Sequence, residues 1–297
     1  MNILNEIPRS DWHNGQNPIG LFICDFDGTL LRSDRSFSND DLEALQRLGE
    51  LGIARAIATG RSIYSINTIP ISNLPVDFLI FSSGAGINRH PDGLIIRHTG
   101  LETHQVRKAI QTLQTNKLDF MVHRPIPDNH AFCYFESTAG NADFNRRIEI
   151  YHQFAEPLND KNDGFDMATQ LLAVVPPGDN RPLIQTLRTA LPDFNIIQTT
   201  SPLDGCSTWI EIFPATVSKS LAAAWLAEMF NLDAVQTLSV GNDYNDVDLL
   251  EWAGCSFVVQ NAPHELTDRF PIVASNDDGG VAEAVEHWLA SDSFNQL

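Results

Sequence analysis

Short apolar runs alternate with segments of helical periodicity, and this alternation constrains the fold more than any other feature. Residues 19–25 form an apolar run that ends in a carboxylate, as expected of a buried strand that leads into a loop. Residues 38–51 carry leucines at helical spacing, and residues 53–58 are a second apolar run. Such alternation predicts a doubly wound α/β domain with a parallel sheet.

The pattern changes after the third predicted strand, at residues 77–81. A Pro-Asp-Gly turn at 91–93 indicates a hairpin, and returning strands and helices follow in irregular order. We therefore expect an inserted α+β domain at 85–209, with a polar stretch at 159–164, inside an α/β domain formed by 1–84 and 210–297. Residues 1–18 are polar and are interpreted as a short extension before the first strand.

Composition excludes several classes of partner. The formal net charge of -19 argues against nucleic acid and against an anionic membrane surface, because both attract basic proteins. No apolar run is long enough for a membrane span, and the start of the chain lacks the pattern of a signal peptide. The four cysteines are dispersed, which favours reduced thiols and a cytoplasmic location. A small-molecule partner and a monomer or small homo-oligomer are expected.

The clearest chemical motif is Asp-Phe-Asp-Gly-Thr-Leu at 25–30, at the end of the first predicted strand. Open α/β sheets place ligands at the carboxyl ends of their strands. Asp25 and Asp27 are two positions apart, so both carboxylates can face one site, where one can act as a nucleophile and the other can transfer a proton. The alternative interpretation is an ordinary Asp-Gly turn that ends a strand.

Two further motifs supply groups that can bind phosphate. Thr59 and Gly60 follow the second predicted strand, where a hydroxyl and backbone amides can contact phosphate oxygens. An ordinary strand-to-helix turn is the alternative. Lys219 begins a predicted helix at 217–230, where a cation opposes the helix dipole and therefore implies a neighbouring anion. A surface lysine is the alternative there.

The last motif is Gly-Asn-Asp-Tyr-Asn-Asp at 241–246, again after an apolar run. Asn242, Asp243 and Asp246 offer oxygen ligands of the kind that Mg²⁺ prefers. A polar turn with an Asx cap is the alternative. Because each motif lies at a predicted strand end or helix start, the motifs together predict one site with a nucleophile, a phosphate clamp, a cation and a metal.

In this order the motifs resemble those of the haloacid dehalogenase-like (HAD) phosphohydrolases. The place and α+β character of the insert resemble the Cof-type subgroup, subclass IIB, with its C2-type cap on a Rossmann-like core. The resemblance implies that Asp25 is the nucleophile, that Asp27 is the general acid and base, and that Thr59 and Lys219 bind the transferring phosphate. Two departures are Asn242, where the family usually has Asp, and Ser83, where it usually has Asn.

The expected function is a Mg²⁺-dependent phosphatase that forms an aspartyl-phosphate and acts on a small phosphorylated metabolite, with a sugar phosphate suggested by family analogy. The expected metal ligands are Asp25, the Asp27 backbone carbonyl and an oxygen of Asn242 or Asp243. Asp246 is expected either to bind the metal directly or to contact the residues that do. A phosphomutase and a non-catalytic binding protein with the same fold are the alternatives. Candidate substrate-binding residues in the insert are His123, Arg124 and His130. The alternative, which fits these polar residues equally well, is that they form the solvated end of a hairpin.

Overall fold

The computed structural model describes residues 17–90, 92–159, 167–291 and 294, in two compact units. Unit 1 comprises the described parts of Met1–Arg61, Ser65–His98 and Ser218–Leu297, and unit 2 those of Ser62–Tyr64 and Thr99–Val217. The predicted N-terminal extension and the predicted polar stretch at 159–164 lie almost wholly outside the described residues.

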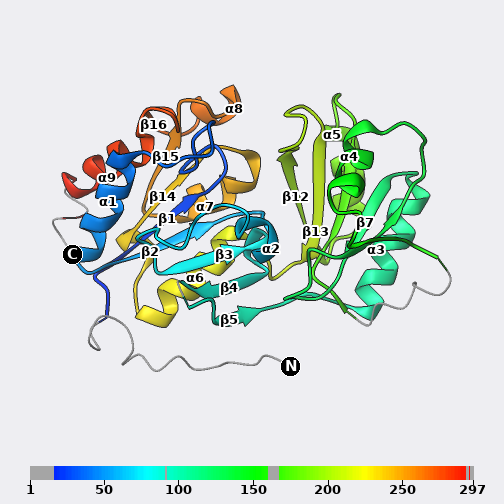
Figure 1. Ribbon diagram of the computed structural model, residues 1–297, viewed down its shortest axis with the longest axis horizontal. Coiled ribbons are helices and arrows are strands. Elements are labelled where there is room, and N and C mark those ends of the chain that lie inside the picture. The colour runs from blue at the N-terminus through cyan, green and yellow to red at the C-terminus, as the bar shows by residue number, and fades with distance from the viewer. Residues whose placement is uncertain (1–16, 91, 160–166, 292–293, 295–297) are drawn as a thin grey trace. The chain divides into compact units, whose positions relative to one another are not determined.

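Unit 1 is built on an eight-stranded sheet with the order β16-β15-β14-β1-β2-β3-β4-β5 (Figure 1). The strands from β16 to β3 are parallel to their neighbours, whereas β4 and β5 add an antiparallel edge. The parallel part confirms the predicted α/β class. The strands span β1 Gly20–Asp25, β2 Ile53–Ala58, β3 Phe78–Phe81, β4 Gly86–Arg89, β5 Ile95–His98, β14 Thr237–Gly241, β15 Cys255–Val259 and β16 Ile272–Val273.

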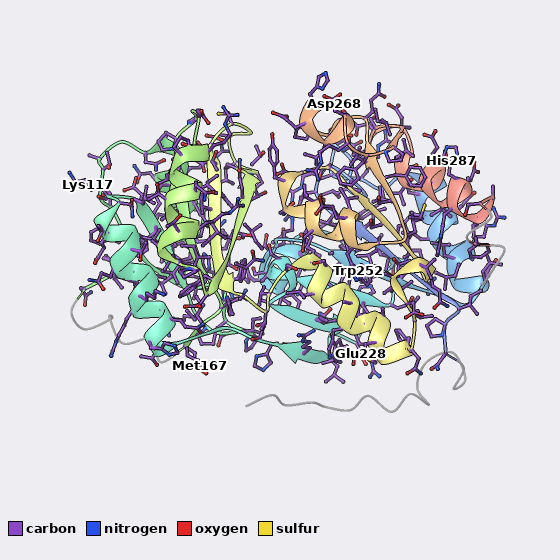
Figure 2. All side chains as sticks on the ribbon, turned by 180° about the vertical axis from the view of Figure 1, so that it is seen from behind. Lys117, Met167, Glu228, Trp252, Asp268 and His287 are labelled. Atoms are coloured by element: carbon purple, nitrogen blue, oxygen red, sulfur yellow. The ribbon has the colours of Figure 1, made fainter. Side chains whose placement is uncertain are left out.

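Helices cover both faces of this sheet, which explains why β1 is buried along its whole length. Phe22 packs in one core with residues of α1 and α9, and Leu21 packs in a second core with residues of α6 and α7. Figure 2 shows α6, which carries Glu228, and α7, which ends at Trp252, in front of the sheet. The helices of unit 1 and its borders span α1 Asn39–Glu50, α2 Ile63–Ile66, α6 Lys219–Phe230, α7 Val247–Trp252, α8 His264–Thr267 and α9 Gly280–Leu289, with short 3₁₀ helices at Ser82–Gly84, Ala234–Gln236 and Tyr244–Asp246.

The β4–β5 hairpin belongs to unit 1, so the two units divide the chain at other residues than the predicted domains do. β4 pairs with β3 in the large sheet, with Ile87 opposite Ile80, and β5 pairs with β4. The boundary predicted at 84/85 therefore lies after His98, and the one predicted at 209/210 lies after Val217. Alternating apolar residues show that a strand buries one face, but they do not specify which sheet it extends.

Unit 2 is the predicted α+β insert, with a six-stranded sheet in the order β12-β13-β11-β7-β8-β9. Its strands are antiparallel to their neighbours except for β9, which is parallel to β8. Residues of α3 and α5 pack in a core on one face, and α4 packs on the other (Figure 1). The elements span β6 Leu101–Glu102, α3 Thr103–Thr115, β7 Asp119–His123, β8 Phe132–Phe135, α4 Ala142–Ile150, β9 Ala155–Pro157, β10 Met167–Ala168, β11 Leu171–Val175, α5 Arg181–Ala190, β12 Phe194–Thr200 and β13 Thr208–Pro214.

Within the described ranges, every helix is too short or too polar to cross a lipid bilayer.

Candidate active site

The end of β1 and the loop after it carry the first two carboxylates of the site. Asp25 is the last residue of β1 and is buried, and Asp27 follows two positions later with its side chain 39% exposed. Gly28 has a φ of +74°, and a Cβ atom there would lie 2.6 Å from Nδ2 of Asn242. Glycine therefore permits the turn and also the close approach of the loop that follows β14.

Lys219 contacts two carboxylates of the site, those of Asp25 and Asp246. Its Nζ lies 2.6 Å from Oδ1 of Asp25 and 2.6 Å from Oδ1 of Asp246, and its side chain is fully buried. The helix α6 begins at Lys219, and Ser218 caps it by accepting a hydrogen bond from the amide of Leu221. The anion that the position of this lysine implied is therefore a pair of carboxylates.

When both carboxylates are ionised, the net charge of this cluster is negative, because two buried carboxylates share one ammonium group. Burial raises the pKa of Asp25 to about 8; the Asp246 carboxylate adds to this rise and Lys219 opposes it. Burial would lower the pKa of Lys219, but Asp246 and Asp25 together raise it well above its usual value. A divalent cation beside Asp25 would offset this negative charge. Among the described residues no group of three or more His, Cys, Asp or Glu side chains could hold a metal ion, so such a cation would also need carbonyl or amide oxygens as ligands.

Asp246 also organises the loop after β14. Its Oδ2 accepts hydrogen bonds from the backbone amides of Asn242, at 2.9 Å, and Asp243, at 3.0 Å. Its two oxygens are thus occupied by Lys219 and by the loop backbone, and its side chain is fully buried. Asn242 and Asp243 are only half-buried, so their side chains are more exposed than that of Asp246, although Oδ1 of Asp243 accepts the amide of Tyr244 at 2.8 Å.

The predicted phosphate-binding residues lie next to Asp25 in the sheet. Ala58 of β2 is the register partner of Asp25, and Thr59 comes directly after it. The Thr59 hydroxyl is buried and accepts a hydrogen bond from the amide of Arg61 at 3.1 Å. A Cβ at Gly60 would lie 3.5 Å from Oγ of Ser83, so the loops after β2 and β3 are also in contact.

The loop after β3 contacts the start of α6 and thereby supports Lys219. Gly84 has a φ of +102°, and a Cβ there would lie 2.2 Å from the carbonyl oxygen of Ser218. Ser83, which departs from the family pattern, has a φ of 54° and donates its backbone N–H to the carbonyl of Thr59 at 2.9 Å. The backbone of this loop therefore connects the threonine loop to the lysine helix.

Sequence reasoning assigned no role to three side chains that bind residues of the site or a direct neighbour of one. Arg61 donates from Nε and Nη2 to the two oxygens of Asp27, each at 2.7 Å. Asn261 donates to the carbonyl of Gly28 at 2.8 Å, and Asp248 accepts hydrogen bonds from the backbone and hydroxyl of Ser220. The only sequence signal was that Arg61 directly follows Gly60.

The three candidate substrate-binding residues of the insert all lie in unit 2. His123 is buried, its Nδ1 lies 2.7 Å from the carbonyl of Asn129, and burial lowers its pKa to about 3. The His130 ring stacks on Tyr64, with ring centroids 4.5 Å apart. Arg124 is about half-exposed, and its Nη2 lies 4.0 Å from Oε2 of Glu156.

Comparison with known families decides how this site is classified. The model of the haloacid dehalogenase-like hydrolases matches residues 22–285, which include all the loops of the site and the whole of unit 2. The chain belongs to this family. Its motifs and insert make it an HAD phosphatase of the Cof type, a phosphoric monoester hydrolase with a cap domain.

Relatives of this HAD phosphatase match along almost their whole length. The 5-amino-6-(5-phospho-D-ribitylamino)uracil phosphatase YwtE of Bacillus subtilis is 25% identical over 287 residues, which cover 90% of this chain and 96% of that protein. A phosphatase of the same superfamily from Bacteroides thetaiotaomicron superposes with a TM-score of 0.72 at 20% identity, covering 91% of this chain and 95% of that chain. A subclass IIB sugar phosphatase superposes with a TM-score of 0.70 at 16% identity, covering 91% of this chain and 98% of that chain. The structural matches show that the fold is shared.

Proposed function

We propose that this HAD phosphatase is a cytoplasmic, Mg²⁺-dependent enzyme that hydrolyses a phosphorylated sugar or sugar alcohol through an aspartyl-phosphate on Asp25. The observation that carries the proposal is the position of Lys219, whose ammonium lies 2.6 Å from the carboxylates of both Asp25 and Asp246. A buried cation beside a carboxylate at a strand end is suited to offset the charge of a transferring phosphoryl group. All four cysteines are free thiols, which supports the cytoplasmic location.

The reaction would proceed in two in-line steps. In the first, a carboxylate oxygen of Asp25 forms a bond to phosphorus while the bond from phosphorus to the ester oxygen breaks, and Asp27 donates a proton to that oxygen. In the second, Asp27 takes a proton from water as the water oxygen attacks phosphorus, which releases phosphate and regenerates the Asp25 carboxylate. The Thr59 hydroxyl, the Gly60 backbone and Lys219 would bind the phosphoryl oxygens.

The metal would be held by Asp25, the backbone carbonyl of Asp27 and a side-chain oxygen of Asn242 or Asp243. Bound Mg²⁺ would supply positive charge that stabilises the phosphoryl group during transfer. Asp246, whose oxygens bind Lys219 and two backbone amides, would orient the metal loop from behind.

The chemistry shared by the named relatives supports the proposed substrate class. One acts on a phosphorylated ribityl chain, and another is a sugar phosphatase, so both bind a phosphate on a polyhydroxylated carbon chain. His123, Arg124 and His130 of unit 2 remain the candidates for contacts to the organic part of such a substrate.

A panel of phosphorylated metabolites, assayed for inorganic phosphate with Mg²⁺ and after chelation, tests the proposal. We expect phosphate release from sugar or polyol phosphates, with the highest kcat/KM among them, and none after chelation. Phosphate release that requires an added sugar bisphosphate, or transfer between positions of one sugar, would instead indicate a phosphomutase. No turnover of any ester by folded protein would indicate a non-catalytic binding protein.

A further inference from the structure

Arg61 forms a two-pronged contact with the proposed acid and base. Its Nε donates to Oδ2 of Asp27 and its Nη2 donates to Oδ1, both at 2.7 Å. The guanidinium fork matches the two oxygens of a carboxylate, so this geometry fixes both the position of Asp27 and the rotation of its carboxylate plane.

Arg61 is itself held from several sides. Its Nη1 lies 3.3 Å from the hydroxyl and 3.4 Å from the carbonyl of Ser65, and its guanidinium carbon lies 5.7 Å from the centre of the Phe26 ring. Its backbone amide donates to Thr59, and its carbonyl accepts from the amide of Ser82. An arginine held in this way can transmit a fixed geometry to its partner.

Asp27, by contrast, depends on Arg61 for its orientation. Its side chain is 39% exposed, and in the described part of the chain Arg61 is the only side chain that donates a hydrogen bond to it. An aspartate on an exposed loop otherwise samples several rotamers, and a misplaced proton donor or acceptor lowers the rate of both proposed steps.

We propose that Arg61 is a positioning residue that holds the Asp27 carboxylate in the orientation needed for proton transfer; this rests on the proposed role of Asp27. The alternative is that Arg61 binds substrate directly. Each of its three guanidinium nitrogens already donates to Asp27 or Ser65, which favours positioning over substrate binding. A residue that acts through Asp27 has no further effect once Asp27 has lost its function.

A double-mutant cycle tests this dependence. Parent, Arg61→Ala, Asp27→Asn and the double variant are assayed with Mg²⁺ on 4-nitrophenyl phosphate and on an alkyl phosphate. We expect Arg61→Ala to lower kcat by about tenfold to a hundredfold with KM changed less than about twofold, and more strongly for the alkyl ester, whose leaving group needs a proton. In the Asp27→Asn background the same change should alter kcat less than about twofold.

Two controls separate positioning from damage to the fold. Methylguanidinium should restore activity to Arg61→Ala, because it can occupy the vacated site beside Asp27, whereas the same concentration of sodium chloride should not. Arg32→Ala removes another arginine of unit 1, one that lies 3.9 Å from Asp277, and should retain parent activity. If Arg61→Ala is misfolded by circular dichroism, Arg61→Lys is used in the same cycle.

Three results would overturn the proposal. These are an unchanged kcat in the Arg61 variant, an equal loss of kcat in the Asp27→Asn background, and a raised KM in both backgrounds, which would assign Arg61 to substrate binding. If the folded parent enzyme releases no phosphate from any ester, both the proposed function and the positioning role of Arg61 are rejected. An active parent with an unaffected Arg61 variant rejects only the positioning role.

Discussion

Nζ of Lys219 lies 2.6 Å from Oδ1 of Asp25, although 194 positions separate the two residues in the chain. The same ammonium lies 2.6 Å from Oδ1 of Asp246, so one buried cation connects the end of β1 to the segment that follows β14. This contact makes Lys219 both a structural link and a group that can offset the charge of a bound phosphate.

Replacing Lys219 should therefore damage stability as well as activity. In Lys219→Met two carboxylates remain buried without their cation, and we expect the free energy of unfolding to fall by about 3–5 kcal/mol. The matched control is Lys108→Met, because Lys108 forms an exposed pair with Asp193 at 3.5 Å and should cost less than about 1 kcal/mol. Urea denaturation measures both values, and equal losses would contradict the account of Lys219.

Asn242 offers a test of the metal loop. Asn242→Asp adds a negative charge to the proposed ligands, so half-maximal activity should need about tenfold less Mg²⁺. Asp243→Ala should raise the requirement. Asp248→Asn is the control, because Asp248 binds Ser220 and is not a proposed ligand. A Mg²⁺ titration of activity at saturating substrate measures this, and an unchanged requirement in both loop variants would place the metal elsewhere.

Gly84 tests whether the loop after β3 positions α6. In Gly84→Ala the new Cβ would lie 2.2 Å from the carbonyl of Ser218, so the start of α6 must shift, and we expect a loss of more than about 2 kcal/mol together with lower kcat. Gly93→Ala has a similar positive φ but nothing within 4 Å of the Cβ, so only backbone strain of about 1 kcal/mol is expected, with parent kcat. Equal effects of the two substitutions would rule out the proposed contact.

Asp41 predicts a pH dependence of stability. It is buried on α1, its Oδ1 accepts the amide of Ala282, and burial raises its pKa from 3.8 to about 6. The folded state therefore binds more protons than the unfolded state between these values, and the free energy of unfolding falls as pH rises through this window. Asp41→Asn removes this loss, so it should be more stable than the parent above pH 6 by roughly 1–2 kcal/mol, with the difference vanishing below pH 3.8.

Thermal unfolding at a series of pH values checks the sign of this effect. Asp34 is a control in which the pKa shift has the opposite sign, because hydrogen bonds from Ser36 lower its pKa. The charge of Asp34 therefore stabilises the folded state, and this contribution is lost only at low pH. An Asp41→Asn variant that is less stable than the parent at neutral pH would contradict the prediction.

The sequence predicted the parallel sheet and the convergence of the motifs for one physical reason. Motifs at the ends of neighbouring parallel strands meet at one edge of a sheet, and the structure indeed brings Asp25, Lys219 and Asp246 into contact. The Arg61–Asp27 pair was not predicted, since the direction of an arginine side chain depends on tertiary contacts that spacing does not specify. The same limit applies to β4, whose partner strand was decided by packing rather than by its own pattern.

Covalent catalysis by Asp25 is the central claim, and acid-quench trapping tests it most directly. The Asp27→Asn variant is mixed with 4-nitrophenyl phosphate and Mg²⁺, because this leaving group departs without a proton while hydrolysis of the intermediate is slowed. Quenched protein is digested and its peptides are weighed by mass spectrometry. We predict a phosphoryl group on the peptide that contains Asp25, and none when Asp25→Asn is added. Sustained nitrophenolate release with no phosphorylated peptide, and at the same rate when Asp25 is replaced, would contradict the account.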